Sequence, residues 1–197
     1  MDEFWLWFST GFQHILDLNG YDHILYVMVL SVLFSIKQWR QLLVLTTAFT
    51  IGHCLTLAVS ALNIIQIKQS IIEILIPVTI IITCFVNLVE VLFPNLKNGK
   101  GLKNYFLNYS LALLFGLVHG LGFSYLLKSM LGKEATVVFP LLSFNLGLEI
   151  GQFIIVCLVL LFSVFLARFT KIQKRIEVIC ISLLVLGIAL LLLVQRI

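Results

Sequence analysis

Six long apolar segments constrain the fold of this chain more than any other feature. A helix needs about 20 mostly apolar residues to cross the hydrocarbon core of a bilayer. The segments are Gly20–Ile36, Leu42–Leu62, Ile71–Phe93, Tyr105–Leu127, Val137–Ala167 and Ile176–Val194. A soluble domain of 197 residues that is 61% hydrophobic and 11% charged has too much surface to hide them. The sequence therefore predicts an all-α membrane protein, a single bundle of about six transmembrane helices over residues 20–197.

Residues 1–19 show a different, amphipathic pattern. Apolar side chains recur at helical spacing on one face, at Phe4, Phe8, Phe12 and Ile15. Polar side chains cover the opposite face. Such a pattern predicts a short amphipathic helix that lies in the membrane interface and precedes the bundle, with Trp5 and Trp7 at headgroup level.

Basic residues are divided unequally between the two ends of the predicted helices. The first, third and fifth loops hold Lys37, Arg40, Lys97, Lys100, Lys103, Arg168, Lys171, Lys174 and Arg175. The opposite ends hold Lys68, Lys128, Lys133 and Arg196. Because Lys and Arg are enriched in cytoplasmic loops, the first, third and fifth loops are predicted to be cytoplasmic and both termini to lie outside.

Polar side chains within the apolar segments each need a physical reason, because a charge near the bilayer centre costs about 3 kcal/mol or more. They recur every three or four residues, which places them on one face of each helix. Residues predicted to line a path or to support a site are Asp17, Tyr26, Thr50, Thr56, Asn87, Glu90, Asn145 and Gln152. The pairs Gly116/Gly120 and Gly147/Gly151 are interpreted as close helix contacts.

The histidines and two of the acids are the candidate metal ligands: His14, Asp22, His23, His53, His119 and Glu149. Imidazole and carboxylate together form a ligand set for divalent first-row metals such as Ni, Co, Zn, Mn or Fe. Two carboxylates would balance the charge of such an ion.

The predicted topology arranges these residues by depth. Asp22 and His23 are expected near the outer surface, with His14 and Asp17 capturing the ion there. His53, His119 and Glu149 are expected near the middle of the membrane. The residues are thus predicted to form a line from the outside to the centre, with Asn87 and Glu90 at a cytoplasmic exit.

Four sequence blocks resemble the HupE/UreJ family of membrane proteins. They are "GFQHILDLNGYDHILYV" (Gly11–Val27), "AFTIGHCLTLA" (Ala48–Ala58), "LLFGLVHGLGFSYLL" (Leu113–Leu127) and "FNLGLEIGQ" (Phe144–Gln152). The resemblance implies a secondary permease for nickel, and sometimes cobalt, in a bacterial inner membrane.

The resemblance also implies roles for particular residues. His14, Asp22 and His23 fall on the family's histidine and Asp-His motif, and His119 falls on the histidine of its later glycine-rich motif. The spacing between His14 and Asp22 is longer than is typical of the nickel permeases. The later motif also lacks part of its His and Glu pattern. The chain therefore resembles a divergent branch of the family.

The leading interpretation is uptake of a divalent transition metal, nickel first, with cobalt or zinc as further candidates. The sequence contains no Gly-rich phosphate loop, which argues against ATP-driven transport by this chain alone. Membrane lipid and the metal ion are the expected partners, nucleic acid is not, and a homo-oligomer is left open.

Two other functions and one purely structural role are also open. A zinc-dependent intramembrane lipid hydrolase would use three His and an Asp to activate water, with Ser60 or Ser124 assisting. A haem-binding electron-transfer protein would use His53 and His119 as axial ligands. A structural or accessory subunit would have no site at all.

Overall fold

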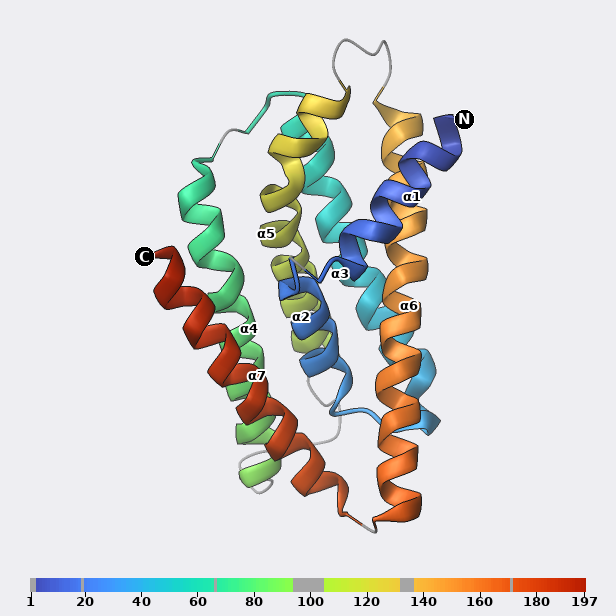
Figure 1. Cartoon of the computed structure of the whole chain (residues 1–197), viewed down its shortest axis with the longest axis vertical. Coiled ribbons are helices and arrows are strands. Elements are labelled where there is room, and N and C mark those ends of the chain that lie inside the picture. Colours follow the sequence, from blue (N-terminus) through green and yellow to red (C-terminus); the bar gives the residue numbers. More distant parts are fainter. Residues whose placement is uncertain (1–2, 19, 66, 94–104, 132–136, 171) are drawn as a thin grey trace.

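The chain is an all-helical bundle. The computed structural model describes residues 3–18, 20–65, 67–93, 105–131, 137–170 and 172–197 (Figure 1). Helices in these ranges are α1 (Glu3–Leu16), α2 (Asp22–Ser31), α3 (Trp39–Ala61), α4 (Gln69–Leu92), α5 (Tyr105–Leu131), α6 (Val138–Phe169) and α7 (Lys174–Arg196). A short 3-10 turn, Ile36–Gln38, precedes α3, and the described ranges contain no strand. Five of the basic residues used to predict the orientation lie outside the described ranges: Lys97, Lys100, Lys103, Lys133 and Lys171.

Five of the described helices, α3 to α7, are long and apolar enough to cross a membrane. They coincide with the second to sixth predicted segments, so the predicted class, a helical membrane bundle, is confirmed. The first predicted segment, Gly20–Ile36, contains only the ten-residue helix α2. At 1.5 Å per residue this helix is about 15 Å long, roughly half the thickness of the hydrocarbon core. It is therefore shorter than the sequence predicts.

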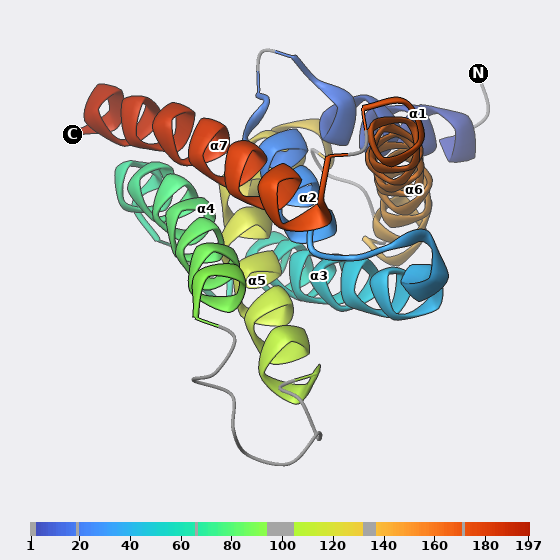
Figure 2. The same cartoon turned by 90° about the horizontal axis from the view of Figure 1, so that it is seen from below.

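The other six described helices are arranged as three pairs around α2. Seen from one end, α3 lies beside α5, α1 beside α6, and α4 beside α7, with α2 between them (Figure 2). Eight of the ten residues of α2 are buried, including Asp22, His23 and Tyr26. The apolar side chains of α2 thus pack on protein, which lets so short a helix sit inside the bundle.

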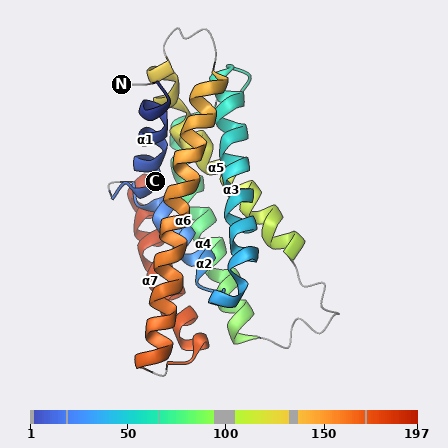
Figure 3. The same cartoon turned by 90° about the vertical axis from the view of Figure 1, so that its right-hand side faces the viewer.

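Helix α1 packs lengthwise against α6, and α1 and α2 follow one another along the long axis of the molecule (Figure 3). The buried side of α1 consists of Trp7, Gly11 and Ile15. The sequence predicts headgroup contact for both tryptophans, but Trp7 is only 1% exposed, whereas Trp5 is 55% exposed. Trp7 shares the face of α1 with Gly11 and Ile15, which contact α6 at Phe144 and Gly151. The interfacial position of α1 itself stays a prediction.

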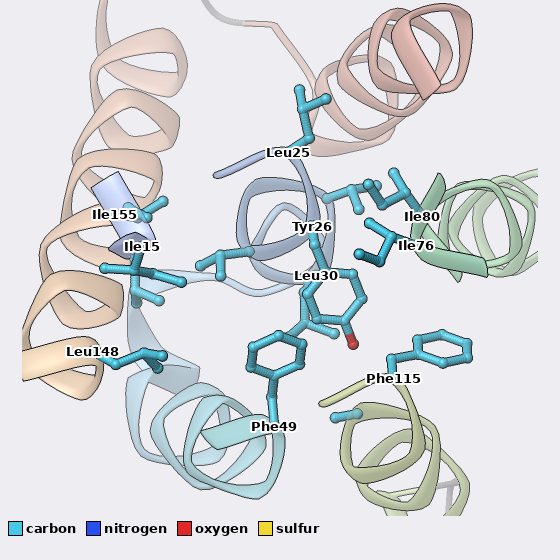
Figure 4. Close-up of a cluster of buried hydrophobic side chains, with 14 of the residues drawn as sticks. Ile15, Leu25, Tyr26, Leu30, Phe49, Ile76, Ile80, Phe115, Leu148 and Ile155 are labelled. Carbon is cyan, nitrogen blue, oxygen red and sulfur yellow. The ribbon is translucent and has the colours of Figure 1, made fainter. Parts of the chain in front are cut away.

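The core contains a layer of aromatic rings from α2, α3 and α5. The ring of Tyr26 on α2 lies between Phe49 on α3 and Phe115 on α5 (Figure 4). Its centroid is 4.8 Å from that of Phe49 and 6.0 Å from that of Phe115. We call these three residues the aromatic layer. Stacked and edge-on arrangements are the ones that aromatic rings prefer, so these contacts join α2 to α3 and α5.

Candidate metal-binding site

Glycines bring the helices that carry the histidines into backbone contact. A Cβ at Gly116 of α5 would meet the carbonyl oxygen of Phe49 on α3, and one at Gly52 of α3 would meet that of Leu113 on α5. Likewise, a Cβ at Gly11 of α1 would meet the carbonyl oxygen of Phe144 on α6, and one at Gly147 of α6 would meet that of Phe8 on α1. Only glycine leaves room for such an approach.

The predicted Gly-xxx-Gly contacts are confirmed. The first pair, Gly116 and Gly120, lies against the backbone of α3 at Phe49 and His53. The second pair, Gly147 and Gly151, lies against α1. These contacts fix the spacing between the elements that carry His14, His53 and His119.

The structure brings all four histidines together. His14 comes from the last turn of α1, His23 from the first turn of α2, His53 from α3 and His119 from α5. The ring centroid of His23 lies 4.5 Å from that of His14, 5.8 Å from that of His53 and 5.1 Å from that of His119. The centroids of His14 and His53 are 5.8 Å apart. We call these four residues the histidine cluster. It is a compact group rather than the predicted line from surface to centre.

The cluster leaves ring nitrogens without hydrogen bonds inside the bundle. The buried Nε2 atoms of His14, His23 and His119, and both ring nitrogens of His53, have no partner among the described residues. An unsatisfied buried polar atom costs about 1–3 kcal/mol. Four such side chains side by side therefore need a ligand, water or another explanation.

Two of the imidazoles are held in a defined tautomer. Nδ1 of His119 donates to the carbonyl oxygen of Phe115 at 2.8 Å. Nδ1 of His23 donates to Oδ1 of Asp22 at 3.0 Å. A proton on Nδ1 leaves the Nε2 lone pair free. Metal-ligating histidines show this pattern, with one ring nitrogen donating to a carbonyl or carboxylate and the other facing the metal.

Asp22 is the acid beside the cluster. It is 7% exposed, and its Oδ1 also accepts the backbone N–H of His23 at 2.9 Å. Its Oδ2 lies 3.4 Å from the guanidinium of Arg196, at the end of α7. Arg196 is a member of the site that the sequence does not single out, because it reads as one of four basic residues at the outer ends of the helices. The one feature of the sequence that could have indicated a role for Arg196 is that it is a single charged residue at the end of a long apolar segment.

A cavity of about 980 Å³ leads to the cluster. His14, Asp22, His23 and His119 line it, together with Asp17, which follows α1. The wall extends to Gln69 at the start of α4, Met130 near the end of α5 and Arg196 at the end of α7. In the predicted orientation these three helix ends lie on the outer side.

The aromatic layer lies beneath the cluster. The ring of Tyr26 is 5.2 Å from that of His119, centroid to centroid. On its other side is a small cavity of about 30 Å³, lined by Tyr26 with Thr83, Asn87 and Asn108 among others. The hydroxyl of Tyr26 is buried without a partner among the described residues. The large cavity is therefore lined by residues on one side of the layer, and the small cavity, whose lining is mostly apolar, adjoins its other side.

Glu149 lies apart from the cluster. Its Oε1 accepts the hydroxyl of Thr47 on α3 at 2.8 Å. It lines a separate cavity of about 260 Å³ with Leu43, Leu146 and other residues, and none of these residues lines the large cavity. The predicted proximity of Glu149 to the histidines is therefore not found, because this part of α6 faces α3 on the side away from α1.

The remaining predicted polar residues bond mostly to neighbouring helices or to their own backbone. Thr50 donates to Gln152 at 2.8 Å, and Thr56 donates to carbonyl oxygens of its own helix. Asn145 donates to the carbonyl oxygen of Leu141 at 2.6 Å.

The two predicted exit residues are on α4. Asn87 donates to the carbonyl oxygen of Val29 at 2.6 Å, near the end of α2, and lines the small cavity. Glu90 is half-buried near the end of α4. Only Asn87 therefore adjoins a cavity that the structure places beneath the aromatic layer.

The class of the molecule follows from these features. It is an integral membrane protein with a buried imidazole cluster at the end of an open cavity. A family model described as "HupE / UreJ protein" matches residues 1–196, and the chain belongs to that family. The family is of transporter type and is associated with nickel and cobalt. No curated protein and no solved structure matches the chain.

Proposed function

We propose that this protein is a secondary transporter for a divalent transition-metal cation, with nickel as the first candidate. The single observation that supports this most strongly is the histidine cluster with its free buried nitrogens. Neutral imidazoles replace the water ligands of such an ion without adding charge. The adjacent Asp22 compensates part of its positive charge.

The spacing of the rings fits a shared ion. A metal–nitrogen bond of about 2.1 Å puts an imidazole centroid about 3.2 Å from the metal, so two rings on one tetrahedral ion have centroids about 5.2 Å apart. In four of the six ring pairs of the cluster the centroids are 4.5, 5.1, 5.8 and 5.8 Å apart. Within the described residues no three His, Cys, Asp or Glu side chains already have the arrangement of a metal site. The proposed site forms when these rings rotate about their side-chain bonds.

The path of the ion follows from the two cavities. An ion enters the large cavity, exchanges water for imidazoles at the cluster, and is stopped there by the aromatic layer. Passage to the other side requires Tyr26, Phe49 and Phe115 to part, which opens the small cavity beside Asn87. In this proposal the structure represents a state in which the cluster is reached through the large cavity. A membrane potential or an ion gradient would drive the net flux.

Two alternatives fit this geometry less well. The serines suggested for a hydrolase, Ser60 and Ser124, line another cavity, which no residue of the histidine cluster lines. A haem between His53 and His119 would need a gap as wide as a porphyrin. The backbones of α3 and α5 are instead in contact there, at Gly116 and Gly120.

Metal accumulation by cells that express the protein tests the proposal. His23→Ala and His119→Ala, singly and together, should abolish Ni²⁺ accumulation above that of cells without the protein, with unchanged amounts of protein in the membrane. Asp22→Asn should reduce it strongly, because it removes the carboxylate beside the cluster. Glu149→Gln is the matched control, since it removes a carboxylate outside the cluster, and it should accumulate Ni²⁺ normally. Wild-type accumulation by the double histidine variant would end the proposal.

A further inference from the structure

Arg196 occupies a position that a transported cation would also favour. It is the penultimate residue of the chain, and its guanidinium reaches into the large cavity from the end of α7. One of its nitrogens lies 3.4 Å from Oδ2 of Asp22, and the other donates to the backbone carbonyl oxygen of Glu73 at 3.1 Å. His14, His23 and His119 line the same cavity. The chain therefore places its own cation beside the proposed metal site.

The electrostatics of Asp22 explain why a cation is needed there. A carboxylate that is 7% exposed has lost most of its hydration, and an unpaired buried charge is strongly destabilising. The other oxygen of Asp22 is already used by the backbone and ring of His23. Arg196, 3.4 Å from Oδ2, supplies the opposite charge there. A divalent ion bound at the cluster would supply that charge instead.

The same two cations repel each other. Unit charges a few ångströms apart in a partly buried site interact by several times the thermal energy, and a divalent ion doubles this. Metal and guanidinium cannot both sit beside Asp22 without a large loss of affinity. The side chain of Arg196 is 25% exposed at the cavity, so it has room to withdraw. Glu73 also lines the cavity, and its carboxylate, which accepts a hydrogen bond from Gln69, is another anion that the guanidinium could approach.

We infer that Arg196 is a built-in competitor for the metal: it neutralises Asp22 when the site is empty, leaves when the ion binds, and lowers the affinity of the site. The inference rests on the proposed function. Arg196 is a positioning residue that acts through Asp22 and does not bind the ion. By weakening binding it speeds release, which a transporter needs and a storage site does not.

Ni²⁺ titration of purified protein by calorimetry, with Ni²⁺ as the only added ligand, tests this. Arg196→Gln removes the charge but keeps a hydrogen-bonding side chain, and it should bind Ni²⁺ about tenfold tighter or more. Arg196→Lys keeps a cation in the cavity and should bind close to wild type. Lys128→Gln is the control. It removes a basic residue that bonds to Asn63, outside the large cavity, and should leave the affinity unchanged.

A second measurement covers the case in which Arg196→Gln fails to fold. Arg196→Ala can be purified in methylguanidinium, which restores the missing group. Stepwise removal of the methylguanidinium, over the range in which the protein stays folded, should then tighten Ni²⁺ binding, whereas the same change should have little effect on wild type.

The outcomes separate the inference from the proposed function. Tighter binding by Arg196→Gln, or by Arg196→Ala after methylguanidinium is removed, supports the competitor role. Unchanged or weaker binding by these variants, with normal binding by wild type, overturns that role and leaves the transporter proposal standing. A wild-type protein that binds no Ni²⁺ overturns both.

Discussion

A single methyl group at Gly116 should separate the two helices that carry His53 and His119. A Cβ at this position would press on the carbonyl oxygen of Phe49. It would lie 2.9 Å from the carbonyl carbon of Phe49 and 3.1 Å from the backbone nitrogen of His53. Ordinary contacts begin at 3.4 Å, so the carbon contact alone requires α3 and α5 to part by about 0.5 Å. The atoms involved are backbone atoms, which have no alternative rotamer.

Gly187 provides the matched control for Gly116→Ala. A Cβ at Gly187 of α7 meets nothing within 4 Å, so Gly187→Ala gains helix propensity without a clash. The difference between the two alanine variants isolates the cost of the clash, about 1–3 kcal/mol for an overpacked interface. For a chain of this size that corresponds to a melting temperature about 2–12 °C lower for Gly116→Ala than for Gly187→Ala.

The assay is thermal unfolding of both purified variants in the same detergent, followed by Ni²⁺ titration. Because His53 and His119 move with their helices, Gly116→Ala should also bind Ni²⁺ more weakly than Gly187→Ala. Equal melting temperatures and equal affinities would refute the claim that backbone contact between α3 and α5 sets the geometry of the histidine cluster.

Two further predictions concern protons and the distant end of the bundle. Ni²⁺ affinity should fall at acid pH, because protons compete with the metal for the imidazole nitrogens, and equal affinity at neutral pH and at the lowest pH at which the protein stays folded would contradict imidazole ligation. Glu177→Ala should destabilise the protein by about 1–3 kcal/mol, because it strands its partners Ser163 and Lys174, and it should leave Ni²⁺ affinity unchanged. Chemical unfolding measures the stability of Glu177→Ala. A variant as stable as wild type would show that the contacts of Glu177 do not stabilise the protein.

Hydropathy predicts the long helices well because apolar character over about 20 residues is what allows a helix to cross a membrane. The structure places α4 at Gln69–Leu92, within two residues of the predicted segment at both ends. Hydropathy fails at α2, where the apolar run continues beyond the end of the helix at Ser31. Apolar residues indicate a water-free environment, and for α2 that environment is other helices. The amphipathic pattern of α1 has the same ambiguity, since the face with Trp7 packs on α6.

The candidate site was predictable in its residue types but not in its geometry. His14, His23, His53 and His119 follow from the cost of polar groups in a membrane, and the structure brings them together. Glu149 satisfies the same rule yet faces Thr47. The difference depends on which helices are neighbours. The pattern of polar residues on one helix does not reveal which helix packs against it.

Arg196 was missed for a related reason. Its partners Asp22 and Glu73 are 174 and 123 residues away in the chain, so only tertiary structure reveals them. Composition counts it merely as one of the basic residues outside the first, third and fifth loops.

The most direct test is the metal content of the purified protein after it is loaded with Ni²⁺ and washed, measured by elemental analysis. Wild type should retain about one ion per chain, because one cluster of four imidazoles forms one site. His23→Ala should retain almost none, since His23 contacts each of the other three rings. Equal metal content in wild type and His23→Ala, or none in wild type, would contradict a shared imidazole site.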